Sequence, residues 1–192
     1  QVVVDAIPVP IAPRARGPIL LDIEAGLYDL DRDQRLEVRD ARGNPIGYPL
    51  IGRVKLSGQQ QLPPTPSHQL DVRFESGLVL EGYDLSATLL SPGSDLTLTL
   101  YWAPHGPLPA DYATFVHLVD QEELIIAQGD GPPRSGRYPT TSWAAGERFD
   151  DEYTMLLPHD LSSGDYHLLV GLYTPADFSR LPVTGGGDHV TL

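Results

Sequence analysis

The sequence predicts a two-layer antiparallel β-sandwich, immunoglobulin-like or jelly-roll in kind, with roughly eight strands in its main domain. Three observations lead to this prediction. Glycine and proline supply 19 residues each to a chain of 192, a density that suits many tight turns. Several segments alternate apolar and polar residues, and Leu96–Trp102 is the cleanest of them. No long segment keeps the apolar spacing of an amphipathic helix.

The expected strands of the main domain follow one another with turn-forming residues between them. A hairpin is predicted through Asp120, Gln121 and Glu122, and at most a helical turn is expected near Pro107–Tyr112 or Pro158–Ser162. The predicted strands are Val72–Phe74, Leu78–Leu85, Leu96–Trp102, Ala113–Val119, Glu123–Gln128, Glu152–Leu157, Tyr166–Tyr173, Arg180–Val183 and His189–Leu192.

An internal repeat divides the chain. The motif Gly26-Leu27-Tyr28, followed by Arg35-Leu36 and Val38, recurs at one fixed offset as Gly171-Leu172-Tyr173, followed by Arg180-Leu181 and Val183. Each copy predicts a strand, a hairpin connection and a second strand. We therefore expect paired residues of the two copies to occupy equivalent positions, with Leu36 and Leu181 both buried.

The repeat defines three segments. Residues 1–57 are predicted to be the terminal strands of a preceding repeat unit, packed on the main domain because so short a segment buries little apolar area alone. Residues 58–66 are polar and rich in proline and predict a linker. Residues 67–192 predict the β-sandwich domain. Because the chain begins with Gln1 rather than methionine, we expect it to be part of a longer protein or a mature product.

Charge and composition limit the classes of partner. The net charge is −13, and all of it lies in residues 58–192, since residues 1–57 carry as many bases as acids. An acidic surface repels phosphate backbones and anionic lipid, so we expect no nucleic-acid partner and no direct membrane binding. The chain has no cysteine, which excludes disulfides and thiolate chemistry. It also has no apolar run of membrane-spanning length.

Known catalytic motifs are missing from the sequence, so we expect no enzyme activity, no catalytic residue and no cofactor. Asp29, Asp31 and Asp33 alternate like the ligands of a calcium loop, with Asp40 at the twelfth position. However, Gln34 stands where such a loop needs glycine. We therefore predict a solvated hairpin turn there and no metal site.

The connection 129–151 is the longest between predicted strands, and long connections are often functional. It combines aromatic residues with carboxylates, as sugar-binding clefts do. The candidate ligand-binding residues are Asp130, Tyr138, Trp143, Asp150 and Asp151, with Tyr138 or Trp143 expected to be partly exposed. The alternative is that the two aromatic rings pack beneath the connection. A glycosidase pair is disfavoured because adjacent Asp150 and Asp151 on a strand point to opposite faces.

Several motifs together resemble an uncharacterised β-sandwich module at the C-terminal, extracytoplasmic end of large bacterial multi-pass membrane proteins. Many of those proteins resemble glycosyltransferases of the dolichyl-phosphate-mannose type. The resemblance implies a location outside the cytoplasm, as a soluble fragment of a membrane-anchored protein, and carries over no catalytic residue. The motifs are Gly82-Tyr83-Asp84-Leu85, Pro92–Trp102, Phe115–Asp120, Ala127-Gln128 with Asp130 and Pro132-Pro133, Trp143 with Gly146-Glu147, and Gly164 with Tyr166 leading into Gly171–Tyr173 and Arg180-Leu181.

Two functions follow from these observations. The first is a non-catalytic extracytoplasmic accessory module of a membrane-associated protein that binds glycan or a cell-surface polymer. The alternative is a structural spacer or protein-interaction domain with no small ligand. A hydrolase with an unrecognised site is a third, weaker hypothesis.

Overall fold

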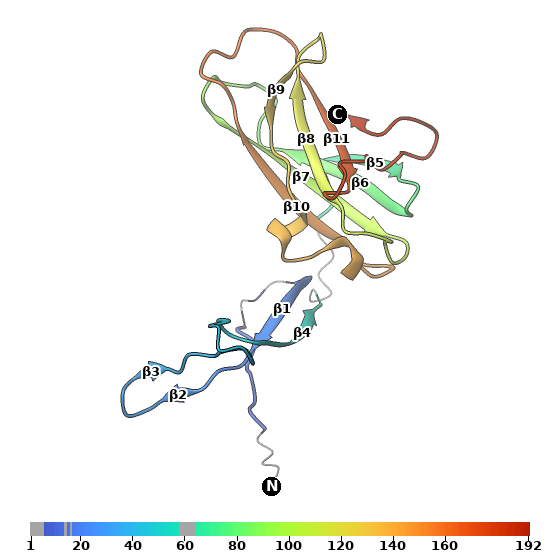
Figure 1. Ribbon diagram of the computed structural model, residues 1–192. Coiled ribbons are helices and arrows are strands. Elements are labelled where there is room, and N and C mark those ends of the chain that lie inside the picture. The colour runs from blue at the N-terminus through green and yellow to red at the C-terminus, as the bar shows by residue number, and fades with distance from the viewer. Residues whose placement is uncertain (1–5, 14, 16, 58–63) are drawn as a thin grey trace. The chain divides into compact units, whose positions relative to one another are not determined.

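The computed structural model describes residues 6–13, 15, 17–57 and 64–192, and its regular structure is almost entirely β (Figure 1). The all-β sandwich prediction is confirmed, because antiparallel sheets pack around one apolar core. The chain divides into two compact units, residues 1–60 (unit 1) and 61–192 (unit 2). This division falls inside the predicted linker. The predicted packing of residues 1–57 on the main domain stays a prediction.

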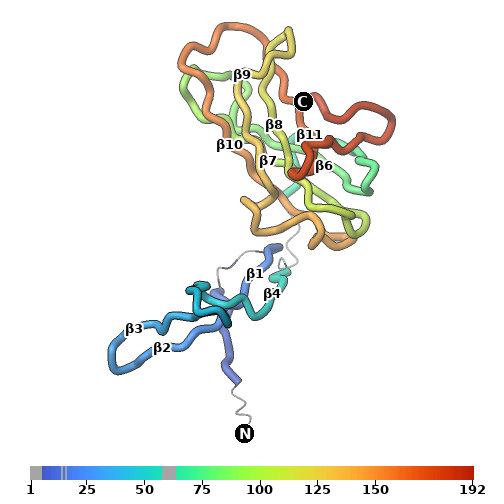
Figure 2. Tube along the Cα trace, viewed as in Figure 1, coloured from blue at the N-terminus to red at the C-terminus, as the bar shows by residue number. Residues whose placement is uncertain are grey.

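Unit 2 contains two four-stranded antiparallel sheets. The first has the order β10 (Phe149–Leu156), β7 (Asp95–Pro104), β6 (Leu78–Leu85) and β5 (His68–Arg73). The second has the order β12 (Val190–Thr191), β11 (His167–Tyr173), β8 (Ala113–Val119) and β9 (Ile125–Gln128). The connection from β9 to β10 crosses one end of the two sheets (Figure 2) and contains the short 3₁₀ turns η1 (Pro133–Gly136) and η2 (Thr140–Ser142).

Alternation along the strands places the core between the sheets. Leu96, Leu98 and Leu100 of β7 point inward, as do Val116 and Leu118 of β8. Every residue of β8 is buried, including those on its outer side. The outer surface of the second sheet is therefore covered locally, and this is where part of the candidate site lies.

Unit 1 contains two small antiparallel pairs. Strand β1 (Ile19–Glu24) pairs with β4 (Leu50–Leu56), and β2 (Tyr28–Asp29) pairs with β3 (Gln34–Arg35). None of the buried hydrophobic residues of the described chain belongs to this unit. The described part of unit 1 thus consists of two small antiparallel strand pairs without an apolar core of its own.

The structure corrects some predicted elements. Neither 107–112 nor 158–162 forms a helical turn, within the limit predicted there, but the two 3₁₀ turns of the 129–151 connection were not predicted. The segment 180–183 forms only isolated bridges, Tyr173 with Arg180 and Phe74 with Val183. In the part of the chain that the structure describes, no helix has the length and apolar character needed to cross a membrane.

Candidate functional site

Tyr138 and Trp143 form part of the core, so the prediction that one of them is exposed is wrong. Their exposed fractions are 0% and 2%. Trp143 meets the Phe149 ring edge-on at 4.5 Å between centroids and lies 6.5 Å from the Trp102 ring. Its indole Nε1 donates to the Tyr138 carbonyl oxygen at 3.0 Å. The rings close one end of the sandwich and offer no surface on which a sugar could stack.

Hydrogen bonds hold this connection against the neighbouring loop. The Thr140 hydroxyl donates to the Ala110 carbonyl oxygen at 2.7 Å and accepts from the Tyr112 backbone N–H at 2.9 Å. The Tyr138 hydroxyl donates to the Glu147 carboxylate, and burial raises the pKa of Tyr138 far above its usual value. The hydroxyl groups of Tyr138 and Thr140 therefore have hydrogen-bond partners within the protein.

Asp151 supports a left-handed turn. Arg134, Ser135 and Gly136 are consecutive residues with φ of 52°, 54° and 80°, a conformation that non-glycine residues adopt only at a cost. The Asp151 Oδ1 atom accepts the Arg134 backbone N–H at 3.0 Å, and its Oδ2 atom accepts the Tyr153 hydroxyl at 2.6 Å. Burial raises the pKa of Asp151, although these two hydrogen bonds act in the opposite direction.

The five predicted residues do not form one site. Asp150 points away from Asp151, as expected for neighbours on a strand, and its carboxylate pairs with Arg134 Nη2 at 3.3 Å. Asp130 follows β9 of the second sheet, where it accepts the Val116 backbone N–H at 2.9 Å and lies 3.2 Å from His117 Nε2. Asp150 and Asp151 therefore both contact Arg134, whereas Asp130 contacts residues of β8.

A row of interacting side chains does cross the outer surface of the second sheet. It begins with Asp130 and His117, whose ring lies 5.0 Å from the ring of Phe115. Arg180 then lies over Phe115, with its Cζ atom 4.4 Å from the ring centroid. We call Asp130, His117, Phe115, Arg180, Asp188 and His189 the outer-sheet row.

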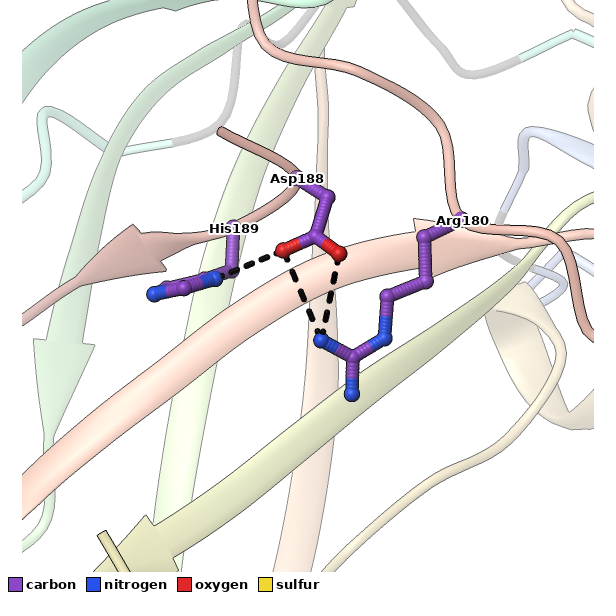
Figure 3. Close-up of polar contacts among 3 residues, drawn as sticks. All are labelled: Arg180, Asp188 and His189. Carbon is purple, nitrogen blue, oxygen red and sulfur yellow. Dashed lines mark hydrogen bonds and ion pairs between the residues drawn. The ribbon is translucent and has the colours of Figure 1, made fainter. Parts of the chain in front are cut away.

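Figure 3 shows the end of this row, where Arg180 and His189 both point toward the Asp188 carboxylate. Arg180 Nη1 lies 3.4 Å from both carboxylate oxygens, and His189 Nδ1 lies 2.8 Å from Oδ1. The hydrogen bond with His189, aided by the charge of Arg180, lowers the pKa of Asp188. Sequence reasoning missed Asp188 and His189 as site residues. Only the repeated Arg180 pointed toward this place.

The row explains two of the repeated residues. A Cβ atom on Gly171 would lie 2.4 Å from the Phe115 ring, so glycine lets this ring lie directly on β11, with Arg180 above it. In unit 1, Arg35 lies over the Tyr48 ring at 4.9 Å, and that ring is 3.4 Å from a Cβ atom built on Gly26. Both copies therefore combine a glycine, an aromatic ring and an arginine.

The repeated hairpins also share backbone geometry. Tyr28 pairs with Arg35, and Tyr173 pairs with Arg180. The Leu36 N–H donates to the Leu27 carbonyl oxygen at 2.9 Å, and the Leu181 N–H donates to that of Leu172 at 2.8 Å. The turn residues Asp33 and Phe178 occupy the same repeat position, and their φ values are 52° and 59°. The predicted equivalence of the two hairpins is confirmed at these backbone positions.

Burial of the repeated leucines differs between the copies. Leu181 is buried as predicted, but Leu36 is 47% exposed, so that part of the prediction is wrong. The physical reason is that the first sheet covers Leu181 in unit 2, whereas the described part of unit 1 contains no corresponding sheet.

The aspartates of the first hairpin act within the turn. Asp29 Oδ1 accepts the backbone N–H groups of Asp31 and Arg32, and Asp33 accepts the Tyr28 hydroxyl. Across the described ranges, no group of three or more histidine, aspartate or glutamate side chains is arranged to hold a metal ion.

A groove of about 580 Å³ lies at the end of unit 2 opposite the 129–151 connection. It lies between the β8–β9 turn and the β10–β11 connection, and its lining includes Asp120, Asp160, Ser162, Asp165 and Tyr166. The Tyr166 hydroxyl donates to the Ser162 carbonyl oxygen at 2.8 Å, which holds the ring in the wall.

Comparison with known proteins adds no family. No protein-family model matches the chain, and no curated protein matches it.

Proposed function

We propose that the chain is a non-catalytic module of a membrane-associated protein, located outside the cytoplasm, that acts as a structural spacer or protein-interaction domain. The location rests on the resemblance of the sequence motifs. Within the protein-interaction role, the surface of unit 1 is the part that lacks a partner, because its apolar residues are not packed into a core.

The duplicated hairpin carries this proposal. Both copies combine a glycine, a ring and an arginine, and both use the same backbone pairing. The ring and the arginine of each copy contact each other, so they stabilise the hairpin and are not available to bind a ligand. Tandem units of this kind bind their neighbours through nearest-neighbour contacts, as repeat proteins do.

A carbohydrate-binding assay tests the proposal. We expect the 1–192 chain to show no saturable binding in calorimetric titrations with oligosaccharides or on affinity gels of cell-surface polysaccharide. We also expect Trp143→Ala to lower the free energy of unfolding of unit 2 by about 3–5 kcal/mol, because a large buried ring is lost. Phe178→Ala is the matched control, since that ring is exposed and its removal changes stability by less than about 0.5 kcal/mol.

Glycan binding is the second candidate, and the groove beside Tyr166 is the observation that favours it. A concave surface that combines an aromatic ring with carboxylates suits sugar hydroxyl groups. If this function is correct, millimolar binding of an oligosaccharide is lost in Tyr166→Ala and kept in Phe178→Ala. Such a result would replace the spacer function.

A further inference from the structure

The inference concerns the apolar face of unit 1 and rests on the proposed interaction role. In unit 2, Leu172 and Leu181 have exposed fractions of 0% and 9%. Their repeat equivalents in unit 1, Leu27 and Leu36, have exposed fractions of 72% and 47%. The leucines of the repeated hairpin are thus buried in unit 2 and exposed in unit 1.

The structure of unit 2 shows what covers the buried copy. Leu168, Val170 and Leu172 of β11 belong to one core cluster with residues of the first sheet, such as Leu98 and Leu100. The repeat equivalents of the three β11 residues are Ile23, Ala25 and Leu27. A sheet built like β10-β7-β6-β5 is therefore the missing layer over unit 1.

The strand order identifies a second missing neighbour. Strand β11 pairs with β12 along one edge and with β8 along the other. In unit 1, Glu24 pairs with Leu50 as its equivalent Leu169 pairs with Thr191, so β4 corresponds to β12. In the described part of unit 1, the edge that corresponds to the β8 side of β11 is unpaired.

We propose that unit 1 is the acceptor half of a second β-sandwich and that its occupant is a preceding repeat unit of the same polypeptide. That unit supplies a β8-like strand, which adds antiparallel to the segment 22–28. It also supplies a sheet whose aliphatic side chains cover Leu27 and Leu36. The order of elements in unit 2 supports this occupant, since there the covering strands all come before β11 in the chain.

Energetics favour a strand partner. A two-stranded hairpin is at best marginally stable in water, and an open strand edge pairs readily with another strand. Burial of the bare leucines recovers hydrophobic free energy in proportion to the apolar area removed from water. Addition of a strand also satisfies the backbone groups of the open edge, as in other strand-addition complexes.

A tandem variant tests the proposal. In this variant, a second copy of residues 64–162 is inserted between Gly17 and Pro18. The added copy then precedes unit 1 at the same spacing at which residues 64–162 precede the repeated hairpin of unit 2. Because the chain has no cysteine, a single Leu36→Cys substitution gives a specific thiol probe. We expect its alkylation rate to fall at least about tenfold in the tandem variant relative to the 1–192 chain.

Two matched probes control this measurement. Leu89→Cys, at an exposed position of unit 2, reacts at the same rate in both chains. Leu181→Cys, at the buried repeat position, stays slow in both and reports that unit 2 is folded. An added copy that carries Val116→Asp loses the protection of Leu36→Cys, because the substituted residue belongs to the inner side of β8.

Several outcomes overturn the proposal. One is an equal Leu36→Cys rate in both chains while Leu181→Cys stays slow. Another is slow alkylation of Leu36→Cys already in the 1–192 chain, without the added copy. If that protection depends on protein concentration, a second copy of the chain covers the face. If it does not, unit 2 covers the face. Binding of oligosaccharide overturns the spacer function but leaves the Leu36→Cys result unchanged.

A second measurement does not need the tandem variant to fold. A synthetic peptide of residues 111–121, which contains β8, is added to the 1–192 chain. We expect slower hydrogen exchange of the backbone amides of residues 22–28, and no effect from a scrambled peptide. Unchanged exchange at saturating peptide contradicts the strand-acceptor role.

Discussion

At the scale of single residues, Asp151 combines a buried carboxyl group with a structural task. It holds the Arg134 backbone N–H in a left-handed turn and accepts the Tyr153 hydroxyl, which also hydrogen-bonds the Thr114 hydroxyl at 2.8 Å. Burial raises the pKa of Asp151, so the folded state binds its proton more tightly than the unfolded chain does.

This shift predicts the pH dependence of stability. A carboxyl group with a raised folded pKa stabilises the fold below its unfolded pKa of about 3.9, and this contribution is lost as the pH rises through the folded value. We expect Asp151→Asn to remove that loss, so the difference in unfolding free energy between the variant and the original protein shifts in favour of the variant above about pH 4. Urea unfolding at a series of pH values measures it.

Two controls complete the Asp151 experiment. Asp151→Ala removes the same titrating carboxyl, so its pH profile runs parallel to that of Asp151→Asn, but it lies about 1–3 kcal/mol lower because Arg134 N–H and the Tyr153 hydroxyl lose this partner. Asp150→Asn removes the partly exposed carboxylate that pairs with Arg134 Nη2 and lowers stability by less than about 1 kcal/mol. Parallel profiles for Asp151→Asn and the original protein would contradict the burial argument.

At the scale of elements, the repeated hairpin requires glycine where an aromatic ring lies directly against the strand. Gly171 has the Phe115 ring and the Asp188 carbonyl oxygen within 2.7 Å of a built Cβ atom. Gly26 has only the Tyr48 ring, and it lies at 3.4 Å. The same repeat position is therefore crowded in unit 2 and open in unit 1.

We expect Gly171→Ala to lower the free energy of unfolding of unit 2 by about 1–3 kcal/mol, because the Phe115 ring and the Arg180 contact must shift. Gly26→Ala is the matched control and costs less than about 1 kcal/mol. Denaturant unfolding monitored by tryptophan fluorescence reports on unit 2, since both tryptophans lie in its core. Equal losses in unit 2 stability for the two variants would contradict the close-approach explanation.

At the scale of the whole molecule, charge separates the two parts of the chain. Residues 58–192 carry the entire net charge of −13, while residues 1–57 are neutral. The negative charge of unit 2 favours solubility and repels polyanions. Unit 1 has no net charge, so it does not repel an acidic sheet that packs on it.

This charge distribution predicts the absence of nucleic-acid binding. We expect duplex DNA to show no retardation in gel-shift titrations with the 1–192 chain at physiological salt, and none when the salt is lowered to about 50 mM. Tight, salt-sensitive binding would show that a local basic surface outweighs the overall charge.

Local sequence patterns determined the class of fold and much of the element order. The predicted strand Ala113–Val119 matches β8, and Leu78–Leu85 matches β6, because alternation along a strand is readable without its neighbours. The repeat also predicted the paired hairpins, since the repeated residues on both sides of the turn form the same backbone pairs in the two copies.

The candidate site was less predictable. Tyr138 and Trp143 have the same residue types as a sugar platform, and only the surrounding Phe149 and Trp102 show that they are core residues. Asp130 is separated from Asp150 and Asp151 because it follows a strand of the other sheet.

The sequence by itself determined that this protein is a β-sandwich chain with a duplicated hairpin and an acidic second part. Only the tertiary structure decided which copy of Leu36 and Leu181 is buried, which aromatic rings form the core, and how Asp188 and His189 join Arg180. The physical reason is that periodicity and turn chemistry are local, whereas burial depends on which distant segment packs on a face.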